Sequence, residues 1–123
     1  INFFATWCPP CQAETPVMRE VSERYRDRGL ELIAISVQET STTDVQAYAD
    51  RYQLKYTIGF DASGRIFRSY RVYALPTQFF VDPNGVIRDV AQGPLTVEAA
   101  SAYIERILPS GGPAGASPAN PSP

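Results

Sequence analysis

The sequence predicts a three-layer α/β fold, in which a mixed sheet is flanked by helices. Strand and helix signals alternate along the 123-residue chain, which is typical of parallel strands joined by crossover helices. Residues 30–37 (LELIAISV) are mostly apolar, as expected of a strand that is covered on both faces. Residues 82–85 (DPNG) are a strong turn signal between two antiparallel strands. Together these observations predict the order β-α-β-α-β-α-β-β-α.

The first half of the chain is expected to contribute two strands, each followed by a helix. Residues 1–5 (INFFA) have the composition of a buried strand, and Pro10 can begin a helix because its missing N–H would be unpaired there anyway. Gly29 is expected to end this helix. Its inward-facing side chains recur at helical spacing: Val17, Met18, Val21 and Tyr25. After the strand at 30–37, a Thr-x-x-Gln capping box at 43–46 predicts the start of the next helix.

The second half is expected to add a short strand, a short helix, a hairpin and a final helix. The short strand spans residues 56–60, and Asp61 is expected to cap the short helix after it. That helix should bury three side chains: Ile66, Phe67 and Tyr70. Strands at 78–81 and 86–91 form the hairpin, and Thr96 caps the last helix. We expect the other aromatic side chains of this region to lie in the core as well: Phe79, Phe80 and the tyrosines.

The composition predicts one folded domain, residues 1–108, followed by a disordered tail at 109–123. The tail has five prolines, three glycines and no charge, so it has little to offset the entropy of ordering. Because Ile1 already lies inside an apparent strand, we expect an upstream segment to be missing. Any signal peptide or membrane anchor would lie there.

Charge and composition exclude several classes of function. Lys and Arg number 11 against 13 Asp and Glu, with no basic run, so the chain is not expected to bind nucleic acid. Histidine is absent, which excludes Ser–His and Cys–His catalytic pairs and every metal site that needs His. No apolar run approaches the roughly 18 residues of a membrane-spanning helix.

Two cysteines, Cys8 and Cys11, occupy the turn between the first strand and the first helix. Helix-terminal N–H groups place partial positive charge beside Cys8, which lowers a thiol pKa from about 8.5 toward 7 or below. The thiolate is the form that attacks disulfides, so Cys8 is the expected nucleophile. Cys11 lies one helical turn deeper, where it can displace the partner from Cys8.

A structural disulfide and half of a zinc site are the alternative interpretations of this pair. Closing a four-residue loop restricts the unfolded chain by about 2 kcal/mol, against ~3 kcal/mol for fifteen residues, so the pair would be a weak staple. Zinc needs two further ligands, which could come only from carboxylates or a second chain. Redox chemistry is therefore the favoured interpretation.

Residues 4–11 (FATWCPPC) resemble the active-site signature of thioredoxin-fold thiol–disulfide oxidoreductases of the TlpA/ResA type. Pro16 matches the helix-kinking proline of thioredoxin-like proteins, and residues 73–82 (YALPTQFFVD) resemble the cis-proline loop and its following strand. The stretch 38–58 resembles the central insertion that separates this group from plain thioredoxin. The resemblance thus implies a thioredoxin-like fold with a central insertion.

The resemblance also implies a substrate-binding surface around the cysteines. The Leu75–Pro76 bond should be cis and should face the cysteine pair. The backbone of Ala74 and Leu75 could then pair with an extended partner peptide. Trp7, beside the nucleophile, is expected to belong to the same docking surface.

One acidic residue completes the predicted site. Thioredoxins place a buried Asp on the first strand, six residues before the nucleophile, where this chain has Asn2. An amide cannot take up a proton, so that role must move or vanish. Glu39 matches a buried active-site glutamate of ResA-like proteins, and in an apolar pocket its pKa would be raised, as a proton carrier for Cys11 requires. A solvated Glu at a strand end is the alternative.

The resemblance implies a monomeric extracytoplasmic enzyme that reduces disulfides in partner proteins, for example in cytochrome c maturation. A membrane-bound thiol reductant would restore its dithiol, and no metal or organic cofactor is implied. Three other functions remain open: a thiol peroxidase on the same fold, a copper-binding assembly protein and a redox-inert interaction module. Peroxidases usually set Thr, Cys and Arg around the peroxide, and the copper proteins use wider Cys spacing with a distal His; this chain shows neither pattern.

Overall fold

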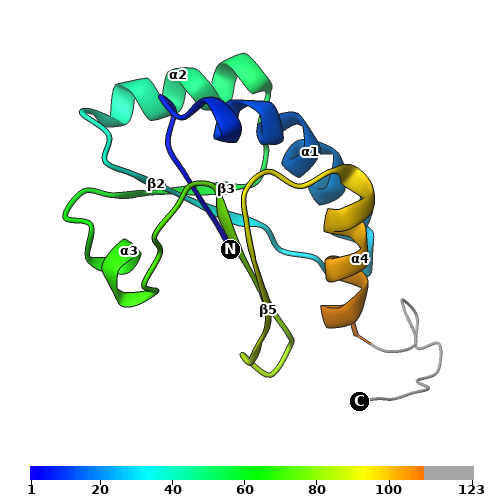
Figure 1. Cartoon of the computed structure of the whole chain (residues 1–123). Helices are drawn as coiled ribbons and strands as arrows, with labels where there is room; N and C mark the ends of the chain where they lie inside the picture. Colours follow the sequence, from blue (N-terminus) through cyan, green and yellow to red (C-terminus); the bar gives the residue numbers. More distant parts are fainter. Residues whose placement is uncertain (110–123) are drawn as a thin grey trace.

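One mixed sheet of five strands forms the middle layer of the molecule (Figure 1). The computed structural model describes residues 1–109, so the tail predicted for 109–123 lies, apart from Pro109, outside the described residues. The elements follow in the predicted order: β1 (Asn2–Phe4), α1 (Pro9–Tyr25), the 3-10 turn η1 (Arg26–Arg28), β2 (Ile33–Val37), α2 (Thr42–Tyr52), β3 (Thr57–Asp61), α3 (Arg65–Ser69), β4 (Thr77–Val81), β5 (Ile87–Gln92) and α4 (Val97–Ile107).

The strands lie in the order β3-β2-β1-β4-β5, so β1 is central. β1 and β3 run parallel to β2, whereas β4 runs antiparallel to both β1 and β5. The stretch 38–58, expected to be an insertion, contains α2 and leads into β3, the outermost strand on one side. The β4–β5 hairpin turns where the sequence predicts, with the Asp82 carboxylate accepting from the backbone N–H groups of Asn84 and Val86.

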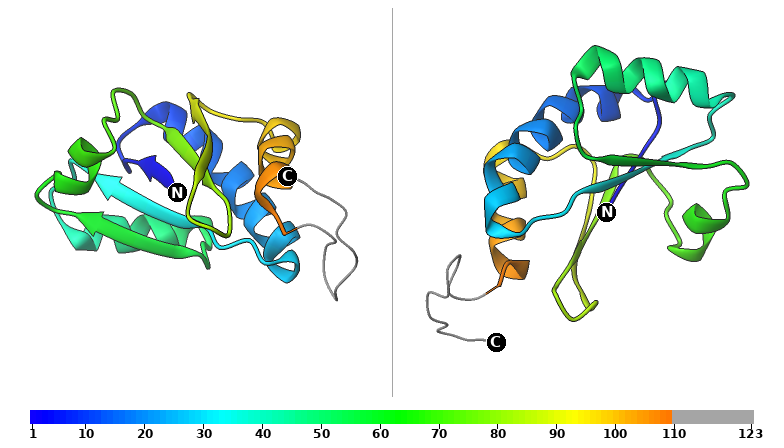
Figure 2. Two further views of the ribbon diagram at one scale, coloured as in Figure 1. Left: turned by 90° about the horizontal axis from the view of Figure 1, so that it is seen from below. Right: turned by 180° about the vertical axis from the view of Figure 1, so that it is seen from behind.

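Helices cover both faces of the sheet, α1, α2 and α4 on one face and α3 on the other (Figures 1 and 2). Neighbouring residues of β1 point to opposite faces, as the two-residue period of a strand requires. The Phe4 ring lies 5.6 Å from the ring of Tyr48 on α2, and the Phe3 ring lies 6.3 Å from that of Phe67 on α3. The predicted three-layer fold is confirmed.

Three local predictions are wrong. The Thr43 capping box does not form; α2 begins one residue earlier, and the Ser41 hydroxyl accepts from Asp44 N–H at 3.2 Å. The short helix α3 has no buried residue: Ile66 is 41% exposed, and Phe67 and Tyr70 are half-buried. Tyr73 is not a core residue, since it is 83% exposed in the loop between α3 and β4.

No helix in residues 1–109 has both the length and the apolar character needed to cross a membrane.

Candidate active site

Cys8 and Cys11 lie where β1 gives way to α1, and they form a disulfide with Cα atoms 5.2 Å apart. Cys8 is the N-cap of α1, and its sulfur accepts from Cys11 N–H at 3.3 Å. The intervening Pro9 and Pro10 carry no N–H, and the first turn of the helix contains no acidic residue. In the reduced protein, a Cys8 thiolate would keep the Cys11 N–H and the positive end of the helix as its stabilising partners.

The cis-proline loop lies against Cys8, as the resemblance implies. The Leu75–Pro76 peptide bond is cis, and Leu75 O lies 3.8 Å from Cys8 Sγ. Pro76 is buried, whereas Ala74 is exposed and its carbonyl accepts from the Thr77 hydroxyl at 2.6 Å. The loop therefore presents backbone beside the disulfide, as docking of an extended peptide requires.

Two aromatic side chains stand out from the surface near this loop. Trp7 precedes Cys8, is 53% exposed, and donates its indole N–H to Gln38 O at 2.9 Å. Tyr73 lies two residues before Leu75 and is the most exposed of the large apolar side chains in the described part of the chain. Exposed aromatic residues of this kind are typical of docking surfaces.

The environment predicted for Glu39 is wrong. Its side chain is half-buried rather than enclosed in an apolar pocket. One carboxylate oxygen accepts from Thr6 N–H at 2.6 Å and the other from the Thr6 hydroxyl at 2.7 Å. Gln12 donates to the Thr6 carbonyl at 2.8 Å, so every polar group of Thr6 is bound. This geometry fixes the two-residue loop before Cys8.

The buried carboxylate of the site is Glu14, which sequence reasoning missed. Its side chain lies one turn beyond Cys11 on α1, and the residue is 2% exposed. Burial raises the pKa of the Glu14 carboxyl, and hydrogen bonds from Leu95, Asn2 and Gln78 oppose that rise. The available signal was its spacing: residues three apart in a helix are neighbours, so a Glu three positions after Cys11 lies on the same side.

A buried series of hydrogen bonds also connects α2 to the first turns of α1. The hydroxyls of Tyr48 and Thr15 lie 2.6 Å apart, and Thr15 donates to Cys11 O at 2.9 Å. Because Thr15 donates to the carbonyl, Tyr48 must be the donor of the other bond. Tyr48 also packs in one core cluster with Phe4 of β1, Cys8 and Cys11, so this packing holds α2 beside the cysteines.

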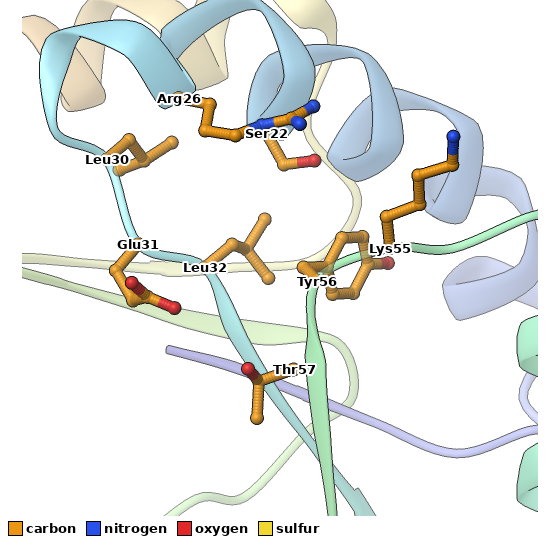
Figure 3. A pocket seen from close by; sticks show the side chains of 8 residues that line it. All are labelled: Ser22, Arg26, Leu30, Glu31, Leu32, Lys55, Tyr56 and Thr57. Carbon is orange, nitrogen blue, oxygen red and sulfur yellow. The ribbon is translucent and has the colours of Figure 1, made fainter.

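The pocket drawn in Figure 3 is separate from this site. It has a volume of about 170 Å³ and lies between the C-terminal half of α1 and the segments that lead into β2 and β3. None of the residues that line it is a predicted site residue. The lining consists of Ser22, Arg26, Leu30, Glu31, Leu32, Lys55, Tyr56 and Thr57. A hollow of about 280 Å³ does border the active-site loop, lined by Thr6, Gln12, Asp44, Ala47, Tyr48 and Arg51.

Among residues 1–109, no three Cys, Asp or Glu side chains come together as a metal-binding group.

Comparisons with known proteins match most of the chain to one family. The family model for the AhpC/TSA family matches residues 1–90. The thiol-disulfide oxidoreductase ResA of Oceanobacillus iheyensis is 36% identical over 109 residues, 89% of this chain and 56% of the relative. ResA of Bacillus thuringiensis is also 36% identical, over 89% of this chain and 62% of the relative. The chain thus spans less than two thirds of the curated relatives it matches.

A solved structure of a thioredoxin-family thiol:disulfide interchange protein from Chlorobium tepidum superposes with a TM-score of 0.79 and 30% sequence identity. The match covers 87% of this chain and 77% of that protein. The fold is thus thioredoxin-like, as the resemblance implied. With the family model matching most of the described residues, the chain belongs to the AhpC/TSA family of thioredoxin-fold proteins.

Proposed function

We propose that the chain is a thiol–disulfide oxidoreductase that reduces disulfides in partner proteins. The observation that carries the proposal is the Cys8–Cys11 disulfide at the start of α1, with the cis-proline loop against its outer sulfur. The relatives named thiol-disulfide oxidoreductase and thiol:disulfide interchange protein support the same activity.

The reaction needs only the two cysteines and the partner disulfide. The Cys8 thiolate attacks one partner sulfur, and the second partner sulfur leaves as a thiolate that takes a proton from water. Cys11 then loses its proton and attacks Cys8 Sγ, which displaces the first partner sulfur. The partner gains two electrons and two protons, and the dithiol becomes the Cys8–Cys11 disulfide.

We assign Glu14 as the group that accepts the Cys11 proton. The two residues share one side of α1, and burial raises the pKa of Glu14 toward the range in which a carboxylate can take a proton from a thiol. Glu39, which the resemblance implied for this role, becomes a positioning residue that holds Thr6 and the loop before Cys8.

Trp7, Ala74, Leu75 and Pro76 are proposed to bind the partner segment that carries the disulfide. Trp7 and Ala74 are exposed, and the backbone of the loop faces Cys8. By analogy with the relatives, we further propose an extracytoplasmic monomer that acts on proteins such as those of cytochrome c maturation. A membrane-bound thiol reductant would then restore its dithiol. No metal or organic cofactor takes part in the proposed exchange.

Trapping of the mixed disulfide tests the function. In Cys11→Ser, the attack of Cys8 should stall and leave a covalent adduct with the partner, which mass spectrometry identifies and a reductant releases. Cys8→Ser is the matched control and should give no adduct. Absence of an adduct in Cys11→Ser, or turnover of hydrogen peroxide with a thiol donor, would contradict the proposal.

A further inference from the structure

Glu14 is held by donors from three separate parts of the fold. Asn2 on β1 donates to Oε1 at 3.1 Å, and Leu95, in the segment before α4, donates its N–H to Oε2 at 2.8 Å. Gln78 on β4 donates from one nitrogen to both oxygens, at 2.8 and 2.7 Å. Asn2 and Gln78 are paired across β1 and β4, so both amides point from one face of the sheet toward α1.

The other end of the Gln78 amide is unused. Gln78 is only 3% exposed, so its Oε1 is buried, and this oxygen has no hydrogen-bond partner within residues 1–109. Leaving a buried polar atom unpaired is costly, and most native structures avoid it. The backbone N–H of Leu95 can only donate to Glu14, whereas the amides of Asn2 and Gln78 each carry an acceptor as well. Of these two acceptors, Gln78 Oε1 is the one that is buried without a partner among the described residues.

We propose that Gln78 is a positioning residue that serves both protonation states of Glu14. Its N–H groups bind the carboxylate, and after the amide turns over, Oε1 accepts from the protonated carboxyl. Each orientation leaves one end of the Gln78 amide without a hydrogen bond. The cost of that unpaired group is therefore present in both protonation states of Glu14 and favours neither of them strongly. Gln78 lies on β4, two residues after Pro76, so the group that steadies the proton acceptor directly follows the cis-proline loop that is proposed to bind the partner.

This inference rests on the proposed role of Glu14 as the acceptor of the Cys11 proton. Few other ionisable groups lie near Glu14: Cys11 is three residues before it on α1, and Tyr56, just before β3, interacts with it electrostatically. Burial raises the pKa of the Tyr56 hydroxyl, so it stays neutral through the pH range of interest. Glu14 therefore responds mainly to the amides that bind it, and of these Gln78 has the acceptor that is buried and unpaired in the described part of the chain.

The first test uses Gln78→Met, which preserves side-chain length and removes both the donors and the acceptor. In the disulfide form no thiol titrates, so carbon-13 NMR of the glutamate carboxyls reports Glu14 alone at this site. We expect its midpoint to rise by about one pH unit or more, because the hydrogen bonds that Gln78 donates to the buried carboxylate are stronger than the one that its Oε1 would accept from the neutral carboxyl. Gln92→Met, which changes an exposed glutamine on β5, should leave the midpoint unchanged.

The second test follows the exchange itself. A coloured thiol is attached to Cys8 as a mixed disulfide, and its release by Cys11 is timed from pH 4 to 9. Gln78→Met should shift this pH profile upward by the same amount as the carboxyl midpoint. A purely structural role would lower the stability and leave the profile in place.

Glu14→Gln separates this inference from the proposed function. If it abolishes the pH step in release while Gln78→Met leaves the step where it was, Gln78 has no such role and the proton transfer to Glu14 stands. If Glu14→Gln leaves the step intact, the role of Glu14 fails, and the inference about Gln78 fails with it.

One measurement needs no variant and so does not depend on Gln78→Met folding. In the wild-type protein, the side-chain amide resonances of Gln78 should shift with pH at the same midpoint as the Glu14 carboxyl. Amide resonances that do not change across that midpoint would overturn the proposal.

Discussion

Replacing Glu39 with alanine removes both hydrogen bonds that hold Thr6. Each bond has a charged acceptor, a class worth about 1.5–3 kcal/mol, and the half-buried setting places the pair near the lower end. The total free-energy loss is also smaller than the sum of two such bonds, because the polar groups of Thr6 can bind water once Glu39 is gone. We therefore expect Glu39→Ala to cost about 2 kcal/mol of unfolding free energy, which for a domain of this size lowers Tm by roughly 8 °C.

Urea unfolding followed by the emission of Trp7, the single tryptophan, measures this loss. Glu98→Ala is the matched control, because Glu98 is an exposed glutamate on α4, far along the chain from the cysteines. The emission of folded Glu39→Ala should also change, since Trp7 binds Gln38 next to the altered position. A loss no larger than that of Glu98→Ala would refute the reasoning.

Glu39→Gln distinguishes positioning from proton transfer. Its amide oxygen can still accept one bond from Thr6, so a positioning role predicts a loss between those of wild type and Glu39→Ala. The pH profile of exchange should keep its shape. If Glu39→Gln instead removes a pH step from the profile while stability is unaffected, Glu39 carries the proton and our assignment is wrong.

Three further predictions concern burial. Burial raises the folded-state pKa of Glu14 above its ordinary value of 4.5, so the folded protein binds more protons than the unfolded chain. The associated stability is complete below about pH 4.5 and is lost as the pH rises through the folded pKa, at up to about 1.4 kcal/mol per pH unit. Urea unfolding of wild type and Glu14→Gln across this range should show that slope in their difference, and a flat difference would contradict it. Tyr48→Phe should cost about 1 kcal/mol through the lost bond to Thr15, measured against the exposed control Tyr73→Phe, and equal losses would count against the bond. Phe3→Ala should cost about 3–5 kcal/mol because Phe3 is fully buried, and a loss below about 1 kcal/mol would be inconsistent with that packing.

Local signals made most of the fold and the centre of the site predictable. Cys8 lies at a strand-to-helix turn because apolar residues precede it and Pro10 follows it, and all three features are adjacent in sequence. The hairpin at 82–85 depends on Asp82 bonding to residues two and four positions away. Such short-range interactions can be predicted from the local sequence without knowing the rest of the structure.

The buried carboxylate could not be found in the same way. Two of its partners, Gln78 and Leu95, lie 64 and 81 residues away from Glu14. The resemblance favoured Glu39, which follows an apolar strand as a buried acid would. The Glu39 carboxylate instead accepts hydrogen bonds from Thr6 at the edge of the site. The spacing of Glu14 from Cys11 indicates that the two share one side of α1, but which of the two acids is buried depends on how distant strands and loops close over them.

Similar reasoning applies to Tyr73. Its aromatic ring favours the core on composition alone, but the core positions of the neighbouring segment are already filled by Phe67 and Tyr70, which pack against Phe3. The exposure of Tyr73 follows from that packing and not from its own residue type.

The central claim is that Cys8, as the cap of α1, is ionised at a lower pH than an ordinary thiol. The most direct measurement is the rate of alkylation of each cysteine in the reduced protein as a function of pH, read by mass spectrometry. Cys8 should react first, with a midpoint near pH 7 or below, against about 8.5 for an unperturbed thiol. A midpoint at or above 8.5, or equal rates at Cys8 and Cys11, would contradict it.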